Sequence, residues 1–224
     1  MKTCLLCCVF LLAAGLTARA EAEPLHYEVR FRDAVIATQT LRVANSGDLA
    51  TISTSFAAEM RVFVAVHHYQ EEVSVTMERD GTVRAFRSVV ADGPARTELT
   101  GTAGADDVLQ VVRQGPEGSS TNYIARTDYD LNSLSLYGTA PEDFIPTNQP
   151  ARVLDLVEGK VVPVHLQTIT ESITFERQNL RTLHVIWTEG DRVSHSWHPE
   201  RFSNLPSRYI RQSGHGEFVF QLLR

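Results

Sequence analysis

Cysteine is almost absent from this chain of 224 residues, and all three cysteines precede Val9. The first twenty residues are typical of an export signal: a positive start at Lys2, a short apolar run, and a small-x-small pattern ending at Ala20. The apolar run is shorter than the ~20 residues needed to span a bilayer. We therefore expect a signal peptide over 1–20, cleavage after Ala20, a single cysteine-free domain over 21–224 and no stable membrane insertion after cleavage.

Two absences favour a bacterial compartment. Disulfides are usual in small domains exported by animal cells, and a mature domain without cysteine has none. The chain also contains no Asn-x-Ser/Thr sequon. Because a domain of this length can be stabilised by its core alone, it needs no disulfides. We expect a periplasmic or secreted bacterial protein.

Basic residues are in the minority. Without Lys2 and Arg19, 19 basic residues remain against 27 acidic ones, which gives a net charge of −8. The sequence contains no cluster of lysine and arginine residues. An acidic domain of this kind argues against nucleic-acid binding and against electrostatic adhesion to anionic lipid.

Familiar catalytic motifs are missing as well. The chain has no GxSxG nucleophile elbow, no HExxH zinc motif, no glycine-rich phosphate loop and no dinucleotide fingerprint. We therefore expect no cofactor and no catalytic residue, and we predict that the protein is not an enzyme. An uncharacterised enzyme with a site scattered over several strands is kept as the third alternative.

The densest group of chemically active side chains is "RVFVAVHHYQEEVSV" at 61–75. Successive side chains of a strand leave opposite faces of the sheet. His67 therefore shares a face with Tyr69, and His68 shares the other face with Gln70. This geometry predicts a structural or groove-lining strand and no metal site.

What the chain does have is a period of two. In "LHYEVRF" (25–31) apolar and polar residues alternate, and "VIATQTLRV" (35–43) follows as a hairpin partner. Turn signals recur at Asp80-Gly81, Glu158-Gly159 and Gly190. About a dozen strands joined by short turns predict an all-β fold. We expect an antiparallel meander that forms an open half-barrel or a barrel-like curved sheet.

The middle of the chain differs from the rest. Residues 128–150 show no sustained alternation and hold three of the nine prolines. Long connections in compact domains are frequently functional. We expect this segment to form a long loop or a short helix that is a candidate lid.

Three segments carry a resemblance: "YEVRFRDAVIATQTLRV", "HHYQEEVSVTMERDGTVRAFRSVVADG" and "LHVIWTEGDRVSHSWHPERFSNLPSRYIRQSGHGEFVFQLL". In them the chain resembles a family of bacterial exported proteins of unknown function, similar in layout to the half-barrel proteins of lipoprotein sorting (the LolA/LolB type). Where that family has a glycine in its first turn, this chain has residues 32–34, "RDA". The resemblance implies a periplasmic half-barrel. The half-barrel relatives carry acyl chains in an apolar cavity, which is an analogy of fold.

The concave face of a curved sheet must be filled by its own side chains, by a loop or by a ligand. Because helices are scarce, we expect a lipid or another apolar ligand there, which would make the protein a soluble periplasmic carrier. The alternative is a non-catalytic module that binds another protein of the cell envelope. The predicted ligand-binding residues are Phe63, Val64, Val66, Tyr69, Phe86, Trp187 and Trp197.

Overall fold

The structure, a computed structural model, describes residues 23–32, 34–62, 65–137, 150–175, 177–200, 205–213 and 216–223. The predicted signal peptide, Phe63 and Val64 lie outside these ranges. In the described part of the chain most residues belong to strands, and no α-helix occurs. The prediction of an all-β fold is confirmed. No helix in this part is long and apolar enough to cross a membrane.

Among the described residues, fifteen strands form one sheet in which all neighbours are antiparallel except β9 and β10. The strands are β1 (Leu25–Phe31), β2 (Ala34–Ser46), β3 (Leu49–Val62), β4 (Ala65–Glu78), β5 (Val83–Asp92), β6 (Ala95–Ala103), β7 (Val108–Gly115), β8 (Gly118–Ala125), β9 (Leu131–Asn132), β10 (Ala151–Asp155), β11 (Lys160–Phe175), β12 (Gln178–Glu189), β13 (Arg192–Pro199), β14 (Arg208–Ser213) and β15 (Gly216–Leu223). Two 3-10 turns, η1 (Arg126–Asp128) and η2 (Ser135–Tyr137), flank β9.

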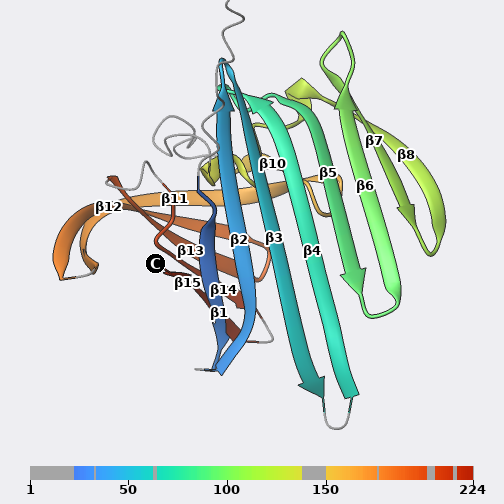
Figure 1. Ribbon diagram of the computed structural model, residues 1–224. Helices are drawn as coiled ribbons and strands as arrows, with labels where there is room; N and C mark the ends of the chain where they lie inside the picture. The colour runs from blue at the N-terminus through green and yellow to red at the C-terminus, as the bar shows by residue number, and fades with distance from the viewer. Residues whose placement is uncertain are drawn as a thin grey trace, which may run out of the picture.

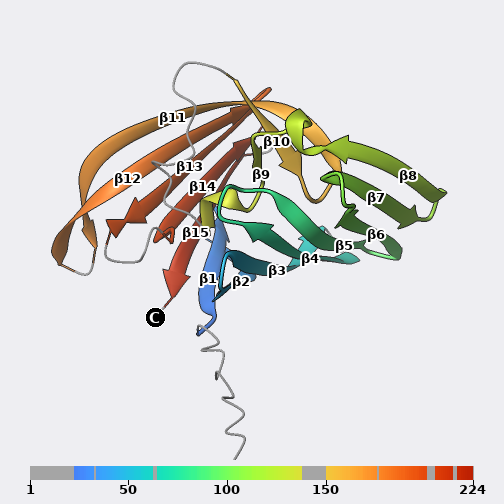
Figure 2. The ribbon, with the colours of Figure 1, turned by 90° about the horizontal axis from the view of Figure 1, so that it is seen from above.

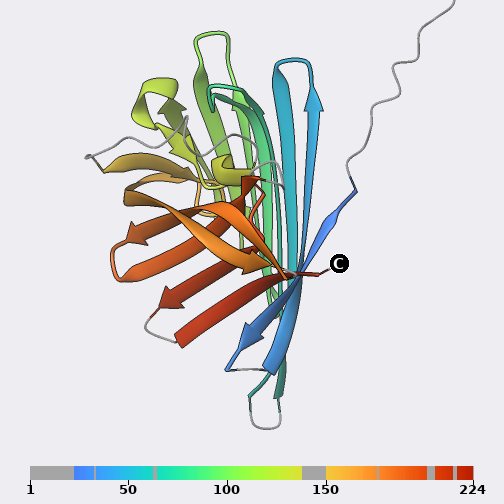
Figure 3. The ribbon, with the colours of Figure 1, turned by 90° about the vertical axis from the view of Figure 1, so that its left-hand side faces the viewer.

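The first and last strands meet in the middle of the sheet. β1 pairs with β15 from His26↔Leu223 to Phe31↔Phe218, and β8 and β9 form the two edges. The sheet is therefore an open curved meander and not a closed barrel. We call β1–β8 the N-terminal wing and β10–β15 the C-terminal wing. Figures 1 and 3 show the wings diverging from the β1–β15 junction, and Figure 2 shows β9 between them.

The turns lie where the sequence predicts them. β4 and β5 are joined at Asp80-Gly81, where Gly81 has φ 83° and Asp80 Oδ1 accepts a hydrogen bond from the Thr82 amide at 2.9 Å. Gly159 (φ 65°) lies between β10 and β11, and Gly190 (φ 58°) lies between β12 and β13. A positive φ suits glycine because it has no Cβ to clash.

Residues 126–137, which we call the plug, fill part of the concave face. Tyr129, Leu131 and Leu134 of the plug are buried. The Tyr129 hydroxyl accepts a hydrogen bond from the Val83 amide at 3.0 Å, and Asn132 Nδ2 donates to Met77 Sδ at 3.1 Å. The described part of the predicted mid-chain connection, 128–137, thus packs within the concave face. Residues 138–149 lie outside the described residues.

The two wings also touch through the turn between β10 and β11. A Cβ added to Gly159 would lie 2.5 Å from Leu99 Cδ2 and 3.1 Å from Val111 Cγ1. Leu99 (β6) and Val111 (β7) belong to the main core cluster, together with Leu154 and Leu156 at the end of β10. This contact brings the far ends of the sheet together over the concave face.

Candidate ligand pocket

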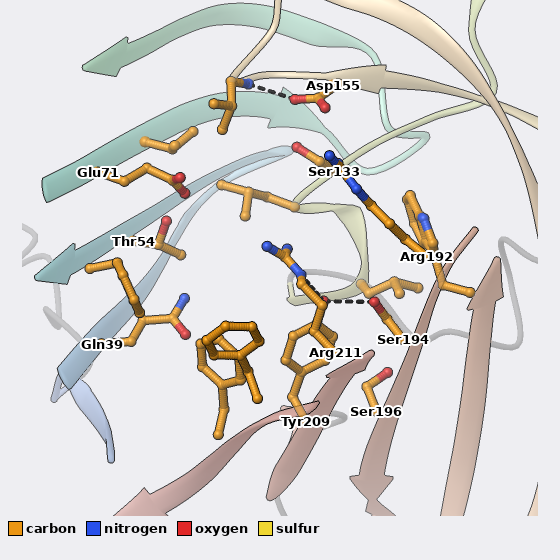
Figure 4. A pocket seen from close by; sticks show the side chains of 18 of the residues that line it. Gln39, Thr54, Glu71, Ser133, Asp155, Arg192, Ser194, Ser196, Tyr209 and Arg211 are labelled. Carbon is orange, nitrogen blue, oxygen red and sulfur yellow. Dashed lines mark hydrogen bonds between the residues drawn. The ribbon is translucent and has the colours of Figure 1, made fainter. Parts of the chain in front are cut away.

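A pocket of about 510 Å³ lies on the concave side of the sheet. Its lining comes from β2–β4 of the N-terminal wing, from β10–β15 of the C-terminal wing and from residues 133–137 of the plug. Figure 4 shows side chains from both wings pointing into this space. Ligand pockets in proteins typically measure about 300–1,000 Å³, so this volume is that of a small-molecule site.

Aliphatic and aromatic side chains of β2, β3, β4 and β15 line part of the pocket beside polar residues such as Thr54, and we call this apolar set the apolar wall. The strands contribute every second residue, as Phe56 and Ala58 of β3 and Phe218 and Phe220 of β15 illustrate. The Phe56 ring contacts the Phe220 ring, with their centroids 6.3 Å apart. The members of the apolar wall are Ile36, Phe56, Ala58, Val73, Phe218 and Phe220.

The polar wall is formed by β13 and β14 and adjoins the apolar wall at β15, where Phe218 pairs with Arg211 and Phe220 with Tyr209. Its members are also alternate residues, so their side chains share one face of the sheet. The Tyr209 hydroxyl donates to Ser194 Oγ at 3.1 Å, and Ser196 Oγ lies 2.8 Å from His198 Nε2. The members of the polar wall are Ser194, Ser196, His198, Tyr209 and Arg211.

Arg211 is the most unusual residue of the pocket. Protein surrounds it on nearly all sides, yet its side chain is exposed because it faces the open space of the pocket. Its Nε donates to the Tyr209 hydroxyl at 3.2 Å. The electrostatic effect of Tyr209, with a smaller one from Glu71, raises the pKa of Arg211 in spite of burial. The guanidinium therefore keeps its positive charge.

Glu71 of β4 lies on the other side of the pocket from Arg211 (Figure 4). Its Oε2 accepts a hydrogen bond from the Tyr69 hydroxyl at 2.8 Å. Burial, followed by the charge of Glu71, raises the pKa of Tyr69, and burial raises that of Tyr137. Both tyrosines therefore keep their protons and remain hydrogen-bond donors at neutral pH.

The other carboxylates at the pocket have structural partners or stand at its rim. Asp155 Oδ1 accepts from the amides of Val157 and Glu158, at 2.8 and 3.1 Å, and so closes the turn after β10. Glu158 lies 3.9 Å from Lys160 Nζ. Glu189 and Arg192 face each other across the β12–β13 hairpin.

Two of the predicted ligand-binding residues, Tyr69 and Trp187, line the pocket. Phe86 faces the same side of the sheet but is only 4% exposed, because its ring lies over Gly101 in the core. Val66 is 44% exposed and is not part of the lining, and neither is Trp197.

Strand alternation places Val66 and Trp197 away from this pocket. In β4 the pocket-lining residues are Tyr69, Glu71 and Val73, all an odd number of positions from Val66. In β13 the residues on either side of Trp197 face the pocket, so Trp197 faces away. The prediction of Val66 and Trp197 as ligand-binding residues rests on their aliphatic or aromatic character. The face that each side chain occupies depends instead on its position in the alternation along the strand.

Sequence reasoning missed Arg211 and Glu71. Both could have been found from the alternation of side chains along a strand. Glu71 follows Tyr69 by two positions and Arg211 follows Tyr209 by two, so each pair shares a face. The predicted separation of the histidines is confirmed: His67 lies on the face of Tyr69, where Nε2 contacts Asp92 Oδ1, and His68 lies on the other face. The described residues contain no group of three or more histidine, cysteine or acidic side chains placed to hold a metal ion.

On the convex face, Trp197 belongs to a separate polar cluster. Its Nε1 donates to Glu171 Oε1 at 2.7 Å, and its ring stacks on that of His184 with centroids 4.5 Å apart. His184 Nδ1 lies 3.2 Å from Glu171 Oε1, and His184 Nε2 lies 3.0 Å from His195 Nδ1. This cluster ties β11, β12 and β13 together.

Acidification is expected to weaken the fold through His184. Burial lowers the pKa of His184 and His195 lowers it further, while Glu171 opposes the shift. The unfolded chain then binds the proton first, so the free energy of unfolding falls as the pH drops below about 6.5. Urea denaturation at pH 7.5 and 5.5 should show a smaller acid-induced loss in His184→Gln than in the wild type. His68→Gln, on the exposed surface, is the control, and an unchanged loss in His184→Gln would contradict the assignment.

Comparisons with protein-family models, curated proteins and solved structures found no match to this chain. The resemblance to exported half-barrel proteins therefore stays a prediction, and the function has to be argued from the pocket itself.

Proposed function

We propose that this protein is a soluble carrier that holds a lipid or another lipophilic molecule between its two wings in the bacterial periplasm. The observation that carries the proposal is the pocket of about 510 Å³, whose apolar wall faces open space instead of a second layer of protein. Apolar side chains left beside such a space favour an apolar occupant.

The energetics favour a ligand with an extended apolar part. Each methylene removed from water contributes about 0.8 kcal/mol. Association costs roughly 4–15 kcal/mol in lost translational and rotational freedom. About ten buried methylenes are therefore needed before apolar contacts alone offset an association cost of roughly 8 kcal/mol, which lies within that range. A chain of that length, and not a small polar metabolite, suits the apolar wall.

A second candidate function, binding of another envelope protein, is supported by the free edge of the sheet. β8 is an edge strand and its first six residues are exposed. An exposed edge can accept a strand from a partner through main-chain hydrogen bonds. This role uses the outer edge of the N-terminal wing and is compatible with an occupied pocket.

Native mass spectrometry of the full chain, purified from its own host without detergent, tests the carrier. We expect the folded protein to carry an added mass that is lost on denaturation and recovered in an organic extract. A protein of unmodified mass that also takes up no lipid from vesicles would contradict the proposal. A stoichiometric protein partner in place of a lipid would favour the second candidate.

Filling the pocket should abolish binding of an apolar probe. Ala58→Phe places a ring in the pocket, whereas Ala57→Phe places the same ring on the exposed face of the same strand. With the uncharged fluorophore N-phenyl-1-naphthylamine, we expect Kd to rise at least tenfold for Ala58→Phe, about 1.4 kcal/mol. Ala57→Phe should change Kd less than twofold. Equal affinities for the two variants would place the probe elsewhere.

A further inference from the structure

In the part of the chain that the structure describes, Arg211 has no acidic partner, unlike several arginines elsewhere on the sheet. Arg30, Arg84, Arg87 and Arg152 form ion pairs with Glu28, Glu78, Glu98 and Asp130, respectively, on the outside of the sheet. Arg211 lies deep in the protein, where its Nε donates to Tyr209. Among the described residues, neither of its Nη nitrogens has a hydrogen-bond acceptor and no carboxylate is within ion-pair distance.

A guanidinium that faces a pocket without a carboxylate partner is available to an anion. Hydrogen bonds between a guanidinium and an anion are stronger than those between neutral groups. The two Nη groups present a planar fork of N–H donors, which matches the two oxygens of a carboxylate or a phosphate. Figure 4 shows this fork pointing into the pocket.

The surroundings of Arg211 add donors for the same anion. Ser194, Ser196 and Tyr209 supply hydroxyl groups on the same wall. Arg192, also a lining residue, projects into the pocket from the start of β13 (Figure 4). The polar wall therefore combines positive charge with hydroxyl donors and adjoins the apolar wall at β15.

Acidic side chains also line the pocket. Glu71 lies across it from Arg211 (Figure 4), Asp155 and Glu158 lie at the β10–β11 turn, and Glu189 is paired with Arg192 across the β12–β13 hairpin. A second anionic group on the ligand would approach these carboxylates and be repelled. The distribution of charge thus favours one anionic group at Arg211 and disfavours a second one elsewhere on the ligand.

We infer that the pocket binds an amphipathic monoanion, in which a single carboxylate or phosphate ester is attached to a long apolar chain. The anionic oxygens pair with both Nη groups of Arg211 and accept hydrogen bonds from the hydroxyls of the polar wall, and the chain packs on the apolar wall. This inference deepens the proposed carrier function and rests on it.

Direct binding to the delipidated full chain tests the inference. The probes are hexadecanoate, hexadecyl phosphate, hexadecanol and hexadecanedioate, each measured by displacement of N-phenyl-1-naphthylamine. We expect the wild type to bind hexadecanoate or hexadecyl phosphate at least tenfold more tightly than hexadecanol, and hexadecanedioate more weakly than hexadecanoate. Whichever of the first two binds more tightly identifies the head group.

Arg211→Met removes the charge and keeps a chain of similar length. It should weaken binding of the anionic probes at least tenfold and change hexadecanol binding less than twofold, while Arg211→Lys should retain part of the preference. Arg208→Met removes an arginine from the other face of the same strand and should change neither. Thermal melts establish that each variant is folded, and the wild-type comparison of acid with alcohol needs no variant.

The outcomes separate this inference from the carrier function. If hexadecanol binds as tightly as the anionic probes, or if Arg211→Met leaves the preference intact, the inference fails while the carrier function stands. If none of the four probes binds, both fail. If acetate or inorganic phosphate displaces the anionic probes at micromolar concentration, the site binds a free anion, and the inference of an amphipathic ligand is overturned.

Discussion

Replacing Gly159 with alanine is expected to lower the free energy of unfolding by about 2–5 kcal/mol. Two effects combine at this position. A non-glycine residue at φ 65° costs roughly 1–2 kcal/mol. The added Cβ would also lie 2.5 Å from Leu99 Cδ2 and 3.1 Å from Val111 Cγ1, and such overpacking costs about 1–3 kcal/mol. The turn would have to withdraw from the N-terminal wing.

Gly47→Ala and Gly190→Ala separate the two effects. Both glycines have nearly the same backbone conformation, with φ 62° and 58°, and a Cβ at either would meet nothing within 4 Å. Each should therefore show only the conformational cost of roughly 1–2 kcal/mol. Urea denaturation of the three variants measures the difference. If Gly159→Ala costs no more than the two controls, the β10–β11 turn does not hold the wings together.

Tyr129→Ala is expected to destabilise the protein by about 3–5 kcal/mol, as removal of a fully buried aromatic side chain does. Tyr129 is 2% exposed and is the largest fully buried side chain of the described residues. Its ring also lies 4.9 Å from Arg126 Cζ. Since native domains are stable by only about 5–15 kcal/mol, this loss is a large share of the total.

Tyr129→Phe keeps the ring and removes the hydroxyl. The buried Val83 amide then loses its acceptor, which should cost about 1–3 kcal/mol. Because the plug lines the pocket through Ser133, Leu134 and Leu136 of the next turn, Tyr129→Ala should also weaken binding of an apolar probe. A Tyr129→Ala variant with wild-type stability would show that the plug is not an integral part of the core.

The positions of Trp187, which lines the pocket, and Trp197, which faces away from it, show how far local sequence reasoning reaches. The Gly190 turn pairs Trp187 with Ser194 and His184 with Trp197. Residues paired in this way share a face, and His184 is three positions from Trp187, so the two tryptophans face opposite sides. The hairpin register alone was sufficient to separate them. The burial of Phe86 was beyond such reasoning, because it depends on Gly101 of the next strand.

By itself, the sequence determined the all-β class, the antiparallel hairpins, the turns at Asp80-Gly81, Glu158-Gly159 and Gly190, and the unusual middle segment. These features depend on the pleat of a strand and on the backbone preferences of neighbouring residues, so a short window contains the information.

Only the tertiary structure decided which face is concave, that β1 pairs with β15, that the plug packs inside the sheet, and that Arg211 lies across a pocket from Glu71. Each of these features joins segments far apart along the chain. A period of two shows that a strand has two different faces, but it does not show which face is concave. It also does not show which distant strand is the pairing partner. Curvature, the order of the strands and the burial of the plug together select one arrangement, and with it the residues that a ligand would contact.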